Sequence, residues 1–214
     1  ISSQQQVIRF DKETTVEIDL NSQRKILKVF KKIVKDYDCV LLSDYGKGVL
    51  TFTLTQSIIT IAKKNQKKVL IDPKGLDYSK YDGAYLITPN KKEASEASKI
   101  NISDQQSLEL AIKKLKKEFN LDISIITLSE EGVAIFDNEL RIHPTAAREV
   151  YDVTGAGDTV LASLGYALSC DAEIDEAVNF ANLASGVVVG KIGSATASLN
   201  EIISSKKNLV ELKQ

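Results

Sequence analysis

The chain has 214 residues, of which 43% are hydrophobic and 27% are charged, and its 28 Lys and Arg side chains nearly balance 29 Asp and Glu side chains. This composition is typical of a globular protein with a sizeable core, and the balanced charge argues against nucleic acid or a membrane surface as a partner. Cys39 and Cys170 form no CxxC motif and His143 is the single histidine, so neither a disulfide framework nor a multi-histidine metal site is expected. A reducing compartment, the cytoplasm, fits this cysteine usage.

The first 20 residues are predicted to form two strands that stand apart from the rest of the chain. "QVIRF" (6–10) and "TTVEIDL" (14–20) alternate apolar and polar side chains, which is typical of strands with one exposed face. We therefore expect residues 1–20 to form a small β lid, whose exposed strands are a candidate homodimer surface. Residues 21–214 are expected to form one α/β core.

Apolar strands alternate with helices through the middle of the chain. Because these strands are apolar throughout, we expect a mainly parallel central sheet that is buried on both faces in a layered α/β fold. The strands are predicted over 39–44, 67–73, 84–90 and 122–129, followed by a hairpin over 133–144. Helices are predicted over 22–37, 54–65, 91–99, 104–119 (with Asp104 as N-cap), 158–169 and 175–192.

Polar, small or charged residues follow each buried strand directly. They lie in four segments, Asp44–Gly48, Asp72–Gly75, Pro89–Glu93 and Leu128–Gly132. Ligands of open parallel sheets bind outside the carboxyl ends of the strands. Four such strand ends in series therefore predict one shared site.

The segment "DVTGAGDT" (152–159) places Gly155, Ala156, Gly157 and Asp158 at the start of a predicted helix. Glycines let the backbone approach an anion closely, and the first-turn N–H groups and the helix dipole favour a phosphate there. Asp158 could then receive the proton of an attacking hydroxyl in a phosphoryl transfer. The residues alone leave a second interpretation open, in which the glycines make a tight turn and Asp158 only complements the dipole.

The segment "NKKE" also allows two interpretations. Asn90 and Glu93 are three residues apart at a helix start, where they could hold the water ligands of Mg²⁺ or phosphate oxygens. The same spacing is that of a capping box, with Asn90 as the N-cap. Both can hold together.

Three segments, "NKKE", "TLSEEG" and "DVTGAGDTVLASL", resemble in order and rough spacing the ribokinase-like (PfkB) sugar kinases. "LLSDYGKGVL", "IDPKGLDYSKY" and "VVVGKIGSAT" are more closely similar to the members of that family that phosphorylate D-glycero-β-D-manno-heptose 7-phosphate in ADP-heptose biosynthesis. The resemblance covers nearly the whole chain. It implies a ribokinase-like fold, ATP and Mg²⁺ as cofactors, and transfer to the anomeric hydroxyl of the sugar phosphate to give the 1,7-bisphosphate.

The resemblance also implies roles for single residues. Asp158 would be the catalytic base, and Gly155, Ala156 and Gly157 would form the anion hole for the transferred phosphoryl group. Asn90 and Glu93 would organise Mg²⁺ and the ATP phosphates.

Further residues are implied around the nucleotide. Thr127, Ser129 and Gly132 would border its ribose and phosphates, and Asn182 would lie beside the adenine.

Charged groups near strand ends complete the implied set. Lys74 and Lys47 could face phosphates, and Asp152 and Thr154, with the loop after Gly193, fall where relatives hold a monovalent cation such as K⁺.

The resemblance has one gap. The family's kinase domain opens with a further βα segment that forms much of the sugar-binding wall, and the chain starts at the lid. We therefore expect the core to be incomplete at its N-terminus and heptose kinase activity of the isolated chain to be weak or absent. Two alternatives stay open, another PfkB-type sugar or nucleoside kinase and a non-catalytic nucleotide-binding fragment.

Overall fold

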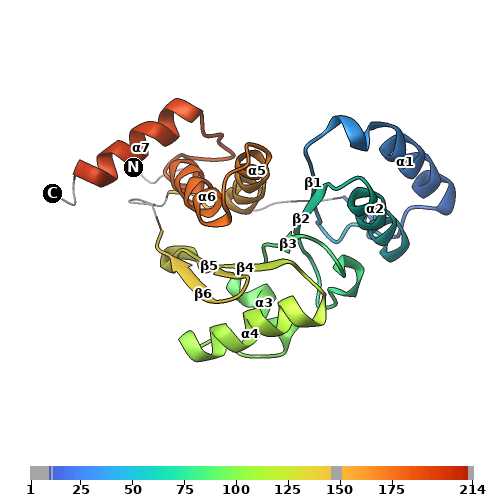
Figure 1. Cartoon of the computed structure of the whole chain (residues 1–214), viewed down its shortest axis with the longest axis horizontal. Coiled ribbons are helices and arrows are strands. Elements are labelled where there is room, and N and C mark those ends of the chain that lie inside the picture. The colour runs from blue at the N-terminus through green and yellow to red at the C-terminus, as the bar shows by residue number, and fades with distance from the viewer. Residues whose placement is uncertain (1–9, 11, 146–150, 212–214) are drawn as a thin grey trace.

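A six-stranded sheet lies between two layers of helices in the computed structural model, which describes residues 10, 12–145 and 151–211 (Figure 1). Its strands follow one another across the sheet in chain order, from β1 to β6. Short connections and right-handed crossovers favour this simple order. The arrangement confirms the predicted layered α/β fold.

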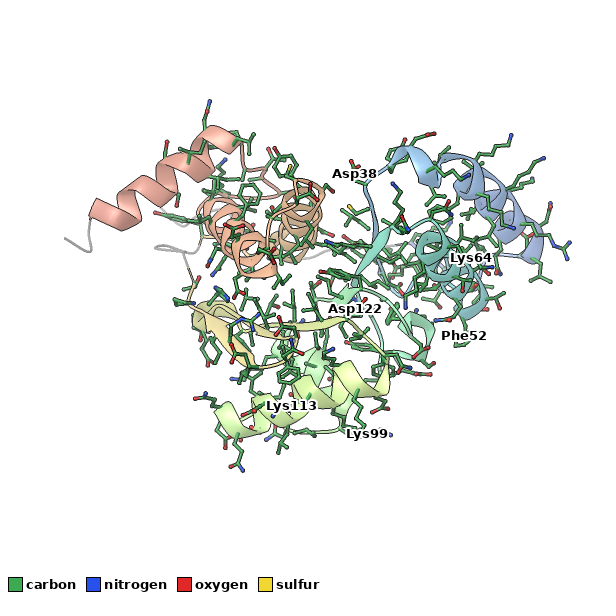
Figure 2. The ribbon with its side chains drawn as sticks, in the orientation of Figure 1. Asp38, Phe52, Lys64, Lys99, Lys113 and Asp122 are labelled. Atoms are coloured by element: carbon green, nitrogen blue, oxygen red, sulfur yellow. The ribbon has the colours of Figure 1, made fainter. Side chains whose placement is uncertain are left out.

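The first four strands are parallel, and the last two form an antiparallel hairpin. They are β1 (Cys39–Ser43), β2 (Lys68–Asp72), β3 (Leu86–Ile87), β4 (Ile123–Thr127), β5 (Val133–Phe136) and β6 (Leu140–His143). A parallel bridge between Asn90 and Thr127 extends the contact between the chain after β3 and the end of β4. The mainly parallel sheet and the hairpin are as predicted. Asp38 and Asp122 precede β1 and β4 and mark the amino ends of the strands (Figure 2).

Each face of the sheet packs against its own helices. α2 (Phe52–Lys64), α3 (Lys91–Ser98) and α4 (Gln105–Glu118) share one apolar core with the sheet, and α1 (Leu20–Ile33) packs on α2. α5 (Ala156–Ser169) and α6 (Ile174–Val189) form a second core on the other face, with α7 (Leu199–Glu211) against α6. The predicted N-cap of α4 is confirmed, because the Asp104 Oδ1 accepts a hydrogen bond of 2.8 Å from the Ser107 N–H.

The strand predicted over 14–20 is wrong. Residues 12–19 form no strand, Asp19 caps α1, and Leu20 is its first residue. A strand needs a neighbour that satisfies its alternating N–H and C=O groups, whereas the Ile18 N–H bonds to the Gly48 carbonyl at 3.0 Å. Residues 6–9 of the other predicted strand lie outside the described residues. The division into a lid and a core, and a homodimer through the lid, stay predictions.

The helix α7 was not among the predicted elements. Its sequence signal is the pair Ser198 and Glu201, three residues apart, whose side chains bond reciprocally to each other's backbone N–H at 2.8 and 3.3 Å. Within the ranges that the structure describes, no helix is long and apolar enough to cross a membrane. Cys39 and Cys170 are both free thiols.

Candidate active site

A cavity of about 670 Å³ opens where the parallel strands end. Residues from all four of the strand ends singled out above line it, together with the starts of α3 and α5 and one side of α6. The four strand ends thus line one cavity, and its role as a binding site stays a prediction. All the residues predicted for catalysis or nucleotide binding except Lys47 line the cavity, namely Asp158, Gly155, Ala156, Gly157, Asn90, Glu93, Thr127, Ser129, Gly132, Asn182 and Lys74.

The start of α5 presents an open anion site. Gly155 is its N-cap residue with a φ of +79°, in the left-handed region that glycine adopts without strain. No side chain caps this first turn in the part of the chain that the structure describes. A helix start whose N–H groups face a cavity attracts negative charge. The residues therefore fit the predicted anion hole, although its function stays a prediction.

Two hydroxyl groups from the end of β1 hold the Asp158 carboxylate. The Ser43 hydroxyl donates to the Asp158 Oδ1 at 3.1 Å, and the Tyr45 hydroxyl donates to the Oδ1 and Oδ2 at 3.1 and 2.9 Å. The bond to Asp158 raises the pKa of the Tyr45 phenol above its ordinary value, so the phenol stays protonated and remains a donor. Sequence reasoning assigned no role to Ser43 or Tyr45, although their position beside a strand end was a usable signal.

A buried ion pair fixes the loop that carries Tyr45. The Asp44 carboxylate accepts from the Lys80 ammonium at 2.6 Å, from the Tyr81 hydroxyl at 2.7 Å and from the Gly46 N–H at 2.7 Å. Burial raises the pKa of Asp44, but these three donors outweigh burial and hold it below its ordinary value. Asp44 therefore stays ionised and anchors the loop to the segment before β3.

Three carboxylates, those of Asp72, Glu93 and Asp158, line the cavity close enough to influence one another. Burial, followed by the charges of Glu93 and Asp158, raises the pKa of Asp72 to about 7. The Lys74 ammonium lies 2.7 Å from the Glu93 Oε1, and this bond raises the pKa of Lys74. The single positive charge of Lys74 offsets only part of the negative charge of these three carboxylates. Asp72 was not predicted as a site residue, because the repulsion depends on spatial neighbours that are far apart in sequence.

Asn90 and Glu93 form the capping box that their spacing allowed. The Asn90 Oδ1 accepts from the Glu93 N–H at 3.0 Å, and the Glu93 Oε2 accepts from the Asn90 N–H at 3.1 Å. Both residues also line the cavity, and Glu93 contacts Lys74 there. The capping interpretation is confirmed, and the geometry leaves room for the metal and phosphate role that stays a prediction.

Backbone turns and helix packing shape the part of the cavity that Thr127, Gly132 and Asn182 line. The Thr127 N–H donates to the Pro89 carbonyl at 2.9 Å, and the Asn182 Nδ2 donates to the Pro144 carbonyl at 2.6 Å. Gly132 has a φ of +101°, and a Cβ there would lie 2.0 Å from the His143 carbonyl oxygen. Only glycine fits this position.

Sequence reasoning missed three cavity residues on α6. Ser185, Gly186 and Val189 follow Asn182 at helical spacings of three, four and seven residues, so one face of α6 borders the cavity. The periodicity of that helix was the signal that could have found them.

The predicted cation-binding residues Asp152 and Thr154 and the predicted phosphate-facing Lys47 lie outside the cavity lining. The Asp152 carboxylate accepts from the Thr154 N–H at 2.9 Å and from the Gly193 N–H at 3.2 Å, so the two predicted segments do meet. Neither Asp152 nor Thr154 lines the cavity, whereas Val153 between them does. Lys47 does not line it either and pairs with Glu13.

The cavity suits Mg²⁺ that arrives with phosphates. No cluster of three His, Cys, Asp or Glu side chains among the described residues is arranged to hold a metal ion. Mg²⁺ in nucleotide sites commonly takes one or two carboxylates, phosphate oxygens and water, and needs no such cage. Asp72 and Glu93 offer carboxylates of this kind beside the open start of α5.

The comparison with protein families gives a match over almost the whole chain. The model described as "pfkB family carbohydrate kinase" matches residues 4–201. The chain is 60% identical over 209 residues to the "Bifunctional protein HldE" of Aliarcobacter butzleri and 59% identical over 202 residues to that of Sulfurimonas denitrificans. These alignments cover 98% and 94% of this chain but 44% and 42% of the relatives. The chain thus spans less than half the length of the curated relatives it matches.

Solved structures share the fold. Ribokinase of Arabidopsis thaliana, complexed with ribose and ATP, has a TM-score of 0.75 at 20% identity, over 89% of this chain and 60% of its own. Phosphofructokinase-2 of Escherichia coli, in complex with potassium, has a TM-score of 0.76 at 17% identity, over 91% of this chain and 64% of its own. The ribokinase-like fold predicted from the sequence is confirmed.

Proposed function

Because this chain belongs to the pfkB family of carbohydrate kinases, we propose that it transfers the γ-phosphoryl group of ATP to a hydroxyl group of a sugar phosphate. One observation carries the proposal. The Asp158 carboxylate lies on the uncapped first turn of α5 and lines the same cavity as Asn90 and Glu93. The proposed base, anion site and metal-binding groups thus line one cavity.

Asp158 is the base of the proposed reaction. It receives the proton of the acceptor hydroxyl as the oxygen of that hydroxyl bonds to the γ-phosphorus and the bond to the ADP oxygen breaks. N–H groups at the start of α5, whose residues line the cavity, stabilise the charge on the transferred phosphoryl group. No covalent enzyme intermediate is needed.

Asp72, Asn90 and Glu93 are the groups that would hold Mg²⁺, directly or through water, and the bound metal would neutralise charge on the ATP phosphates. Lys74 contacts Glu93 at 2.7 Å and provides a further positive charge for the phosphates. The loop that joins Asp152, Thr154 and Gly193 is the proposed place of a monovalent cation. Support comes from the potassium complex of Escherichia coli phosphofructokinase-2, which has the same fold.

The proposed acceptor is D-glycero-D-manno-heptose 7-phosphate, phosphorylated at its anomeric hydroxyl on the route to ADP-heptose. The support is the similarity of "LLSDYGKGVL" and "IDPKGLDYSKY" to the heptose 7-phosphate kinases of the family, and an identity of 60% with a protein named HldE. The same two segments supply Asp44, Tyr45, Asp72 and Lys74 to the cavity.

Calorimetry and a coupled assay of ADP release test this proposal together. We expect Mg-ADP to bind to the chain, and any turnover to be faster with heptose 7-phosphate than with ribose, fructose 6-phosphate or adenosine. A preference for one of the other acceptors would replace the sugar and keep the kinase. Binding of Mg-ADP without turnover on any acceptor would favour a non-catalytic nucleotide-binding role, and absence of Mg-ADP binding would contradict the proposal.

A further inference from the structure

The Asp158 carboxylate is already engaged by a hydroxyl group of the chain itself. The Tyr45 hydroxyl lies 2.9 Å from the Asp158 Oδ2 and 3.1 Å from its Oδ1, while Ser43 donates to the Oδ1 from the end of β1. A general base must lie within hydrogen-bond reach of the hydroxyl that it deprotonates. Tyr45 therefore takes, on both oxygens, the kind of position that an acceptor hydroxyl needs.

The backbone on both sides of Tyr45 is fixed. Asp44 is buried and bonded to Lys80, Tyr81 and the Gly46 N–H, and its own N–H donates to the Asp72 carbonyl at 3.0 Å. Beyond Tyr45, the Gly48 carbonyl accepts from the Ile18 N–H at 3.0 Å. The loop cannot carry Tyr45 away from Asp158 without breaking this network.

The Tyr45 side chain, in contrast, is 61% exposed. Its hydroxyl is held by hydrogen bonds to the Asp158 carboxylate and interacts with the Ser43 hydroxyl. Rotation about its two side-chain torsions would leave the anchored loop unchanged. A fixed backbone that carries an exposed ring is the arrangement that a reversible cover requires.

We propose that Tyr45 is a latch, an inference that rests on the proposed function. Its phenol occupies the acceptor position on Asp158 and keeps water from the carboxylate until a sugar hydroxyl displaces it. With the latch open and no sugar bound, water could attack. Its oxygen would bond to the γ-phosphorus, its proton would pass to Asp158, and ATP would be lost as ADP and phosphate. Tyr45 is thus a positioning residue that favours transfer to the sugar over hydrolysis.

The test is hydrolysis of ATP by this chain in the presence of Mg²⁺ and without any acceptor. We expect Tyr45→Phe, which keeps the ring and removes the hydroxyl, to raise the rate of phosphate release by about tenfold, the effect of one site hydrogen bond on a rate. Adding Asp158→Asn to this variant should return the rate to the wild-type level, because the base is then lost. A purely structural defect would lower hydrolysis and not raise it.

Tyr37→Phe is the matched control, since Tyr37 is 56% exposed and does not line the cavity. It should leave the rate of hydrolysis unchanged. Calorimetry with Mg-ADP separates the two proposals. If Tyr45→Phe binds Mg-ADP as the wild type does but hydrolyses ATP no faster, the latch is wrong and the proposed function stands. If the wild type does not bind Mg-ADP, both proposals fail together.

Discussion

Two sets of residues that line the cavity are held in place by different kinds of contact. The acceptor wall, defined here as Asp44, Tyr45, Asp72 and Asp158, is held by contacts between side chains, among them a 2.6 Å ion pair and two bonds to one carboxylate. The nucleotide wall, defined as Asn90, Thr127, Gly132 and Asn182, is held by bonds in which backbone groups take part, through a capping box, a parallel bridge, a glycine turn and the bond of Asn182 to the Pro144 carbonyl. Asp44 and Tyr45 of the acceptor wall follow the edge strand β1, whereas Asn90, Thr127 and Gly132 of the nucleotide wall lie beside strands inside the sheet.

The two walls therefore differ in how far they can change shape. Backbone turns have few alternative geometries, so the nucleotide wall is expected to keep one shape. Networks of charged side chains respond to pH, metals and bound ligands, because each charge shifts with its neighbours. The acceptor wall is therefore the part of the site that can change when a sugar arrives.

The strongest test of the comparison is Asp158→Asn. The amide keeps the shape of the carboxylate but cannot accept the proton, so any sugar-dependent turnover should fall by about three orders of magnitude. The affinity for Mg-ADP should change by less than about threefold, since the first turn of α5 and the nucleotide wall remain. Coupled ADP release and calorimetry measure the two quantities. A large loss of nucleotide affinity would show that the two walls are not separable.

Gly132→Ala should distort the nucleotide wall. Alanine at a φ of +101° is strained, and its Cβ would lie 2.0 Å from the His143 carbonyl. We expect the free energy of unfolding to fall by about 3 kcal/mol and Mg-ADP binding to weaken, because the turn must move. Chemical denaturation and calorimetry measure both.

The matched control for this change is Gly75→Ala. Gly75 has a φ of +98°, but a Cβ there would meet no atom within 4 Å. It should lose only the strain of the backbone angle, about 1 kcal/mol. Equal losses at both glycines would mean that the close approach to His143 does not matter.

Lys80→Met should weaken the anchoring of Asp44, which belongs to the acceptor wall. Methionine preserves most of the side-chain volume but leaves the Asp44 carboxylate, whose side chain is only 4% exposed, without its cation. The free energy of unfolding should fall by about 2 kcal/mol, less than for a fully buried pair because Lys80 is partly exposed. Lys64→Met, at the exposed end of α2 (Figure 2), should change it by less than about 0.5 kcal/mol. Similar losses at both lysines would contradict the anchoring role of Asp44.

The sequence predicted some residues of the site and missed others for a physical reason. Asn90, Glu93 and the segment Gly155–Asp158 belong to local patterns, a capping box and a glycine-rich helix start, which act over a few residues. The bonds of Tyr45 to Asp158 and the repulsion around Asp72 join residues far apart in sequence, so no local pattern contains them. The same reasoning explains the fold. The apolar strands and the mainly parallel sheet were predictable, whereas residues 14–20 carried a strand pattern without a strand partner.

Asp72→Asn is the mildest change and should act in the opposite direction. The pKa of Asp72 is raised to about 7, so the folded protein holds its proton up to that pH while the unfolded chain releases it near 3.8. Below pH 3.8 both states are protonated and nothing is gained or lost. As the pH rises from 3.8 toward 7 the folded state loses stability relative to the unfolded chain, because the unfolded chain releases this proton whereas burial, Glu93 and Asp158 keep the folded carboxyl protonated.

The full pKa shift corresponds to about 4 kcal/mol, but asparagine recovers only part of it because its amide is a polar group in the same partly buried position; the variant should be more stable than the wild type by about 1 kcal/mol at pH 8 and by much less at pH 5. Denaturation at both pH values measures the difference, with exposed Asp38→Asn as the control that should show none. Saturating Mg-ADP should reverse the order, since a metal held near Asp72 favours its ionised form. A stabilisation independent of pH would show that the acceptor wall gains from packing and not from relief of charge.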